Sequence, residues 1–192
     1  MFEGANKKTE IIFPKYRSSF TNEKGDTFVV FSMENYKDTD KDLKSFIAVL
    51  NDEPVRKYIT NDAMSKYGYT NLEFLAKDIL SNSASRWSEN AERRFLVRDF
   101  QSNAVGMIGV TLKNRAEGEL WYYKTSSVPS FMFEALVVVL DFLKQEGVKD
   151  LFAIYESGNT RSTQILSKLG FKESKSGEMR IILTNLSSNI VH

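Results

Sequence analysis

The sequence contains no cysteine and one histidine, which is its last residue, His192. Without cysteine there is no disulfide, no thiolate nucleophile and no cysteine-ligated metal. A single terminal histidine excludes a Ser-His-Asp triad and a multi-histidine metal site, short of a tail that folds back. We therefore expect no bound metal and a reaction without a covalent acyl-enzyme.

Long apolar runs and a surplus of one charge are missing as well. No segment approaches the ~20 apolar residues of a membrane span, and the lysines among the first ten residues precede no apolar stretch of the kind a signal peptide has. Lys and Arg number 26 against 25 Asp and Glu, a net charge of +1, whereas nucleic-acid binders usually carry a basic excess. These absences favour a cytoplasmic protein with no membrane or nucleic-acid partner.

The composition that is present suits a globular protein. Of 192 residues, 42% are hydrophobic and 27% are charged, which is enough apolar material for one sizeable core. We expect an N-terminal arm at residues 1–26, a single domain at 27–184 and a C-terminal tail at 185–192.

Apolar spacing and turn residues divide the first half of the domain. Leu43, Phe46, Ile47 and Leu50 repeat at helical spacing, and the residue before Pro54 avoids the helical region. The predicted elements are a strand at 27–31, helices at 43–50 and 70–81, an irregular segment at 55–69 and a polar loop at 81–90.

The second half predicts a three-stranded meander followed by alternating helices and strands. The predicted elements are strands at 94–98, 105–112 and 119–123, a helix at 131–146, a strand at 151–155, a helix at 159–169 and a strand at 178–183. This order predicts an α+β (mixed α/β) fold in which helices cover both faces of a central, mostly antiparallel twisted sheet.

Three motifs resemble one family. Residues 159–171, NTRSTQILSKLGF, resemble the N-x-x-S-x-x-[LV]-L-x-K-L-G-F signature of GNAT-superfamily N-acetyltransferases, in particular the RimJ/RimL branch. Residues 51–59 look like that branch's D-P-E-V-x-x-Y segment, and 134–136 look like the end of its G-K-G-Y-A-T-E-A-L motif. The similarity runs in order from about Thr27 to Leu183.

The resemblance implies a GNAT-like fold and transfer of an acetyl group from acetyl-CoA to a primary amine, either a protein N-terminus or a small molecule. In that fold the amine attacks directly in a ternary complex. The loop at 126–133 would hold the diphosphate at a helix N-terminus, and the gap between the strands 119–123 and 151–155 would hold the pantetheine. A strand N–H would polarise the thioester carbonyl. Dimers are common in the fold, so a homodimer is a further expectation.

The resemblance also implies roles for single residues. Ser162 would give a proton to the departing thiolate, and Glu119 would take one from the amine. Asn159 would contact the cosubstrate, although a plain helix N-cap explains it equally, and Glu119 could be a solvated strand end. The residues expected to bind acetyl-CoA are Trp121, Tyr122, Tyr123, Ser127, Ser130, Phe131, Met132, Asn159 and Ser162.

Two departures from the family pattern keep other hypotheses open. The diphosphate loop has no glycine, and Pro129 in it has no N–H to donate, while Trp121 stands where the family usually has glycine. A catalytically inactive GNAT-fold module that binds a ligand or a protein is the alternative. The basic and aromatic tract at 86–94 could contact RNA or an acidic substrate, against the simpler reading of a solvated loop.

Overall fold

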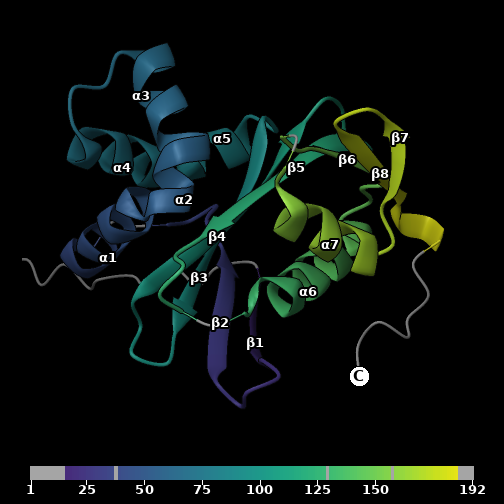
Figure 1. Cartoon of the computed structure of the whole chain (residues 1–192), viewed down its shortest axis with the longest axis horizontal. Coiled ribbons are helices and arrows are strands. Elements are labelled where there is room, and N and C mark those ends of the chain that lie inside the picture. The colour runs from purple at the N-terminus through teal and green to yellow at the C-terminus, as the bar shows by residue number, and fades with distance from the viewer. Residues whose placement is uncertain (1–15, 37–38, 129, 157, 186–192) are drawn as a thin grey trace, which may run out of the picture.

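Eight strands form one sheet in the order β1-β2-β3-β4-β5-β6-β8-β7 (Figure 1). The computed structural model describes residues 16–36, 39–128, 130–156 and 158–185. The strands are β1 (Arg17–Thr21), β2 (Thr27–Ser32), β3 (Glu92–Asp99), β4 (Ala104–Leu112), β5 (Glu117–Lys124), β6 (Asp150–Ile154), β7 (Lys172–Lys175) and β8 (Glu178–Ile182). Every adjacent pair is antiparallel except β5 and β6, which are parallel.

Helices cover both faces of this sheet, as the sequence predicts. The helical elements are α1 (Asp40–Asn51), α2 (Glu53–Val55), the π-helix η1 (Arg56–Thr60), α3 (Asn61–Tyr67), α4 (Leu72–Ser81), α5 (Ser83–Ser88), α6 (Met132–Gln145), α7 (Thr160–Lys168) and the 3-10 helix η2 (Leu183–Asn185). In Figure 1 the blue helices α1 to α4 lie on one side of the sheet and the green helices α6 and α7 on the other. The α+β fold class is confirmed.

Two apolar clusters separate the faces. On the α1–α4 side, Phe46 and Leu80 pack with Met107 of β4. On the α6–α7 side, Leu136 and Leu166 pack with Ile108, the next residue of the same strand. Neighbouring residues of a strand point to opposite faces, so β4 and its partners contribute to both cores.

The prediction of an N-terminal arm is wrong for residues 17–21, because they form β1, which belongs to the sheet and pairs along β2. Just before it, the Tyr16 hydroxyl donates to the carbonyl oxygen of Val138 at 2.9 Å, and its ring lies 4.5 Å from that of Phe142 in α6. These contacts attach the segment to the core. Residues 1–15, and 186–192 of the predicted tail with His192, lie outside the described residues.

The polar loop predicted at 81–90 is wrong too. Residues 83–88 form α5, and Trp87 on this helix is 5% exposed and packs against Phe95. Arg93 stacks on the same indole at 4.9 Å, so the aromatic ring of the tract is core rather than an RNA-contacting surface. The segment 55–69 is helical rather than irregular, through η1 and α3.

Candidate active site

Strands β5 and β6 separate part-way along their length. They pair at only three positions, which join residues 117–119 of β5 to 150–152 of β6. Beyond them, β5 continues to Lys124 beside β4 alone. The parallel pair therefore opens towards the carboxyl ends of both strands.

Unpaired peptide groups line this opening. Thr125 N donates to the carbonyl oxygen of Val105, and Lys113 N to that of Glu117, both at 2.9 Å. These bonds fix which peptide groups of β5 face β4, and because the pattern alternates along an antiparallel pair, those of Leu120 and Tyr122 face away from β4 towards β6. Two N–H groups are thus directed into the gap.

Trp121 does not fill the gap. Its indole lies on the α1–α4 face, flat over Gly109 of β4, where an added Cβ would come within 2.0 Å of the ring. The indole Nε1 donates to Thr111 Oγ1 at 3.1 Å, and the ring stacks on Tyr123 with 5.9 Å between centroids. The indole of Trp121 therefore does not block the strand opening.

Tyr122 and Ser162 meet on the opposite face. The Tyr122 hydroxyl lies 2.7 Å from Ser162 Oγ and 3.3 Å from the Ser162 carbonyl oxygen. Asn159 Oδ1 accepts from the Ser162 N–H at 3.2 Å and caps α7. Burial raises the pKa of Tyr122 to about 12, against the smaller lowering by the Ser162 hydrogen bond, so the phenol keeps its proton at neutral pH.

A cavity of about 630 Å³ opens between the β5–α6 loop, the first turn of α6 and α7. The 14-residue α6 has no side-chain cap, so the N–H groups of its first turn are open to an acceptor. Burial and the nearby Arg161 lower the pKa of Lys124 in the cavity wall. The residues that define this cation-lined cavity are Lys124, Ser126, Ser130, Met132, Arg161 and Lys168, and its lining also includes the carboxylates of Glu23 and Glu134.

Side chains hold the β5–α6 loop, in which the described residues include no glycine. Lys124 Nζ donates to the carbonyl oxygens of Thr125 and Val128, both at 3.0 Å. Asp52 Oδ2 accepts from Ser126 N and Ser126 Oγ at 2.8 Å and from Thr125 Oγ1 at 3.0 Å. The loop is held from both sides. The sequence places Asp52 at a helix end and in the motif at 51–59, but it does not predict this contact with the loop.

The remaining predicted residues are divided between the faces. Ser130 and Met132 line the cation-lined cavity, while Ser127 N donates to Thr125 Oγ1 at 3.3 Å within the loop. The Phe131 ring is fully buried and stacks on Phe28 at 4.7 Å, so only its backbone is available to a ligand.

Tyr123 and Glu119 belong to the α1–α4 face. The Tyr123 hydroxyl donates to Met107 Sδ at 3.4 Å in the core. Glu119 lies opposite Thr111 in the β4–β5 register, half-buried, on the same face as Trp121. Its carboxylate is therefore on the far side of the sheet from Ser162, with the strand opening between them.

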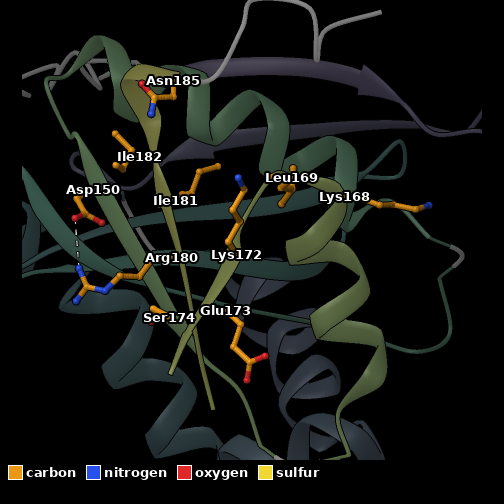
Figure 2. A pocket seen from close by; sticks show the side chains of 11 residues that line it. Asp150, Lys168, Leu169, Lys172, Glu173, Ser174, Arg180, Ile181, Ile182 and Asn185 are labelled. Atoms are coloured by element: carbon orange, nitrogen blue, oxygen red, sulfur yellow. Dashed lines mark hydrogen bonds and ion pairs between the residues drawn. The ribbon is translucent and has the colours of Figure 1, made fainter. Parts of the chain in front are cut away.

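A second cavity, of about 580 Å³, lies along β7 and β8 (Figure 2). Arg180 in it is bound by Glu178 at 2.9 Å and by Asp150 at 3.3 Å, and Figure 2 shows the Lys168 side chain turned away from the other labelled residues. The arginine of this cavity is thus already paired with carboxylates of the protein. Across the described ranges, no three His, Cys, Asp or Glu residues cluster as a metal site, and no helix is long and apolar enough to cross a membrane.

A family model of the acetyltransferase (GNAT) domain matches residues 36–172. The chain belongs to this family. This GNAT chain is accordingly an N-acetyltransferase, as the motifs predict.

Solved structures support the same fold. Mycobacterium smegmatis RimJ in complex with CoA-disulfide is 13% identical, with a TM-score of 0.67 over 92% of this chain and 93% of that one. Ribosomal-protein-S5-alanine acetyltransferase from Vibrio fischeri is 16% identical, with a TM-score of 0.63 over 88% and 99%. Spermidine N-acetyltransferase from Vibrio cholerae, in complex with CoA and spermine, is 17% identical, with a TM-score of 0.61 over 82% and 96%.

The predicted membership of the GNAT superfamily is confirmed, and the chain shares its fold with RimJ and with ribosomal-protein-S5-alanine acetyltransferase. A search of curated proteins finds no match. The acceptor amine therefore has to be inferred from the residues of this chain.

Proposed function

We propose that this chain transfers the acetyl group of acetyl-CoA to a primary amine by direct attack in a ternary complex. The observation that carries the proposal is the opening between β5 and β6, with the N–H groups of Leu120 and Tyr122 facing it. An extended pantetheine with its own amides can pair with these groups as a strand would. The structures of RimJ and of spermidine N-acetyltransferase, which share the fold, hold CoA or its disulfide.

The cation-lined cavity is the proposed site of the diphosphate. Lys124, Arg161 and Lys168 outnumber the two carboxylates of the lining, Glu23 and Glu134, and the uncapped first turn of α6 supplies N–H donors. Side-chain cations can bind phosphate oxygens directly, which compensates for N–H groups of the loop that are engaged within it. Ser127, Ser130, Phe131 and Met132 would contribute through the loop and the helix start.

The proposed reaction uses groups on both sides of the opening. The amine lone pair attacks the thioester carbon, and a strand N–H stabilises the oxyanion. The C–S bond then breaks as the oxyanion re-forms the carbonyl, the sulfur leaves with its electron pair as a thiolate, and Ser162 Oγ–H protonates it and regains a proton from water. Glu119, directly or through a water, removes the proton that the amine loses.

Tyr122 is the proposed positioning residue for Ser162. Hydroxyls of serines inside helices commonly donate to a carbonyl one turn back, as Ser83 does to Ile79 at 2.7 Å. The Ser162 hydroxyl instead pairs with the phenol of Tyr122. When Tyr122 donates in this pair, the Ser162 proton remains available to the sulfur.

Thermal denaturation with ligand tests the proposal. A ligand at 100 times its Kd adds ~2.7 kcal/mol of stability, which raises Tm by roughly 5–10 °C for a chain of this size. We expect CoA and acetyl-CoA to give this shift and Arg161→Gln to reduce it, because a phosphate contact is lost. Lys172→Gln, in the second cavity, is the matched control and should leave it unchanged.

Absence of any shift at millimolar acetyl-CoA would overturn the proposal in favour of a non-catalytic module. If the shift occurs, release of free thiol in the presence of amines measures transfer. Ser162→Ala should then lower kcat while the CoA shift persists. An unaltered kcat in this variant would contradict the proposed role of Ser162.

A further inference from the structure

A third cavity lies on the α1–α4 face, against the side of the sheet that carries Glu119. It has a volume of about 580 Å³, and two stacked aromatic rings of β5 contribute to its wall. The π-helix η1, helices α3 and α4 and the segment between them provide most of the remaining apolar wall. The residues that define this aromatic cavity are Ile59, Tyr69, Leu75, Ile79, Trp121 and Tyr123.

Trp121 is held as a flat surface in this cavity. Its ring lies over Gly109, its Nε1 is bound to Thr111, and Tyr123 stacks against it with an interplanar angle of 11°. These contacts fix the indole on the sheet, and the side chain is only partly buried. A ring that enters the cavity can therefore stack on a preorganised aromatic face.

Four charged side chains line the aromatic cavity; three are bound within the protein, and the fourth, Arg86, adds a positive charge. Arg94 forms an ion pair with Glu92 and donates to the carbonyl oxygen of Ile79 at 2.8 Å. Asp78 Oδ1 accepts from the Asn82 amide at 2.6 Å, and its hydrogen bond to Tyr69 raises the pKa of that phenol. Two arginines and two carboxylates line the cavity, so its lining carries no net negative charge to hold a second ammonium group, as in a polyamine.

The aromatic cavity adjoins the proposed site of acetyl transfer. Glu119 precedes Trp121 by two residues on the same face, about 7 Å along the strand. Thr111, which lies opposite Glu119 in the register, also lines the cavity. The N–H groups of Leu120 and Tyr122 that face the opening lie on either side of Trp121 in the chain.

We propose that the acceptor is a primary amine that carries an aromatic ring a few bonds away, with the ring stacked on Trp121 and the amine beside Glu119. This inference rests on the proposed function and names its substrate class. The same chemistry occurs in a free arylalkylamine and in a peptide that begins with an aromatic residue.

Acceptor preference is the direct test. With acetyl-CoA saturating, kcat/KM is measured for 2-phenylethylamine, n-butylamine and spermidine, and for two short peptides that differ only in beginning with Phe or Ala. We expect the ring-bearing member to exceed its partner by about tenfold or more, the equivalent of ~1.4 kcal/mol. Comparing the amine pair with the peptide pair identifies whether the cavity accepts a free arylalkylamine or a peptide that begins with an aromatic residue.

Variants at Trp121 test whether the preference for ring-bearing acceptors depends on the indole. Trp121→Ala should bring the ratio of 2-phenylethylamine to n-butylamine close to one, chiefly through KM, whereas Trp121→Phe should retain most of it because a ring remains. Trp87→Phe is the matched control, since Trp87 is the other tryptophan and packs in the opposite core. If the ratio stays high in Trp121→Ala, or is never above one, the inference is wrong.

A binding measurement separates failure of the inference from failure of the proposed function. In Trp87→Phe, Trp121 is the one remaining tryptophan, and its fluorescence should respond saturably to 2-phenylethylamine but not to n-butylamine, with or without CoA. A fluorescence response without acetyl transfer would support the aromatic site and contradict the proposed activity. Acetyl transfer to amines without a fluorescence response and without a preference for rings would support the proposed activity and contradict the aromatic site.

Discussion

Gly109 and Trp121 occupy opposite positions on β4 and β5, and the absent side chain of one leaves the space for the other. All three atoms that lie nearest to a Cβ built at Gly109 belong to the indole. This pairing keeps the ring flat on the sheet and out of the strand opening.

We expect Gly109→Ala to lower the free energy of unfolding by about 1–3 kcal/mol, because the added methyl group displaces a packed ring. In a Trp121→Gly background the same change should cost far less, giving a coupling energy of ~1 kcal/mol or more. Urea denaturation of the four chains measures the cycle. Additive effects would mean that the indole does not depend on the space at Gly109.

At the residue scale the sequence predicts the roles of single residues better than contacts between two residues. The motif at 159–171 predicts a helix cap at Asn159, which the structure confirms, and a site residue at Ser162, which stays a prediction. The Tyr122–Ser162 contact joins positions 40 residues apart, and no local pattern encodes it. The side of the sheet on which Trp121 lies follows from the strand register, which becomes known only with the structure.

The β5–α6 loop shows how one element can be held without glycine. A loop whose backbone needs positive φ angles or a close approach usually relies on glycine. Here Asp52, from the α1–α2 junction, accepts three hydrogen bonds from Thr125 and Ser126, and Lys124 binds two of the loop's carbonyl oxygens.

We expect Asp52→Ala to weaken CoA binding about tenfold, because a loop that has lost its acceptor must be ordered by the ligand. The free energy of unfolding should fall by ~1–2 kcal/mol, since water can replace part of the lost bonding at this partly exposed site. Calorimetric titration with CoA and urea denaturation measure the two effects. Asp62→Asn, on the exposed surface of α3, is the control, and equal losses in both variants would contradict a specific role for Asp52.

Helices and strands were predictable where apolar residues recur with a clear period, as in α1, α4 and α6. Residues 83–88 were misread because their serines suggest a loop, whereas the burial of Trp87 supports the helix α5. The strand β1 carries polar residues at most positions, and its pairing with β2 rests on tertiary contacts such as those of Tyr16.

The sheet of the whole molecule ends in the charged strand β7, whose residues Lys172 to Lys175 are all exposed. Next to it, Glu178 accepts hydrogen bonds from Ser174 at 2.7 Å and from Arg180 at 2.9 Å, with Lys175 at 3.2 Å. These donors lower the pKa of Glu178 to about 2. Global stability is thereby linked to pH through this edge of the sheet.

Because the carboxyl is more acidic in the folded chain than its unfolded value of about 4.3, its stabilisation is complete above that pH. It is then lost as the pH falls towards 2. We expect Tm to fall across this window, and less steeply in Glu178→Gln than in the parent chain. Thermal denaturation by circular dichroism between pH 2 and 7 measures the difference, with Glu173→Gln as the control. Parallel curves for Glu178→Gln and the parent would contradict the linkage.

The order of the motifs along the chain predicts the overall architecture, because a strand–helix–strand series with short turns permits few arrangements. The cavities were beyond prediction. Each is lined by residues from distant elements, such as Lys124 with Arg161 or Tyr69 with Trp121.

The fit between Gly109 and Trp121 also constrains how this protein can evolve. A lineage that acquired the indole needed the small residue in place beforehand, and one that now enlarges position 109 must first give up the ring. Mutational paths through the two positions are therefore ordered, and related sequences should keep them or change them together.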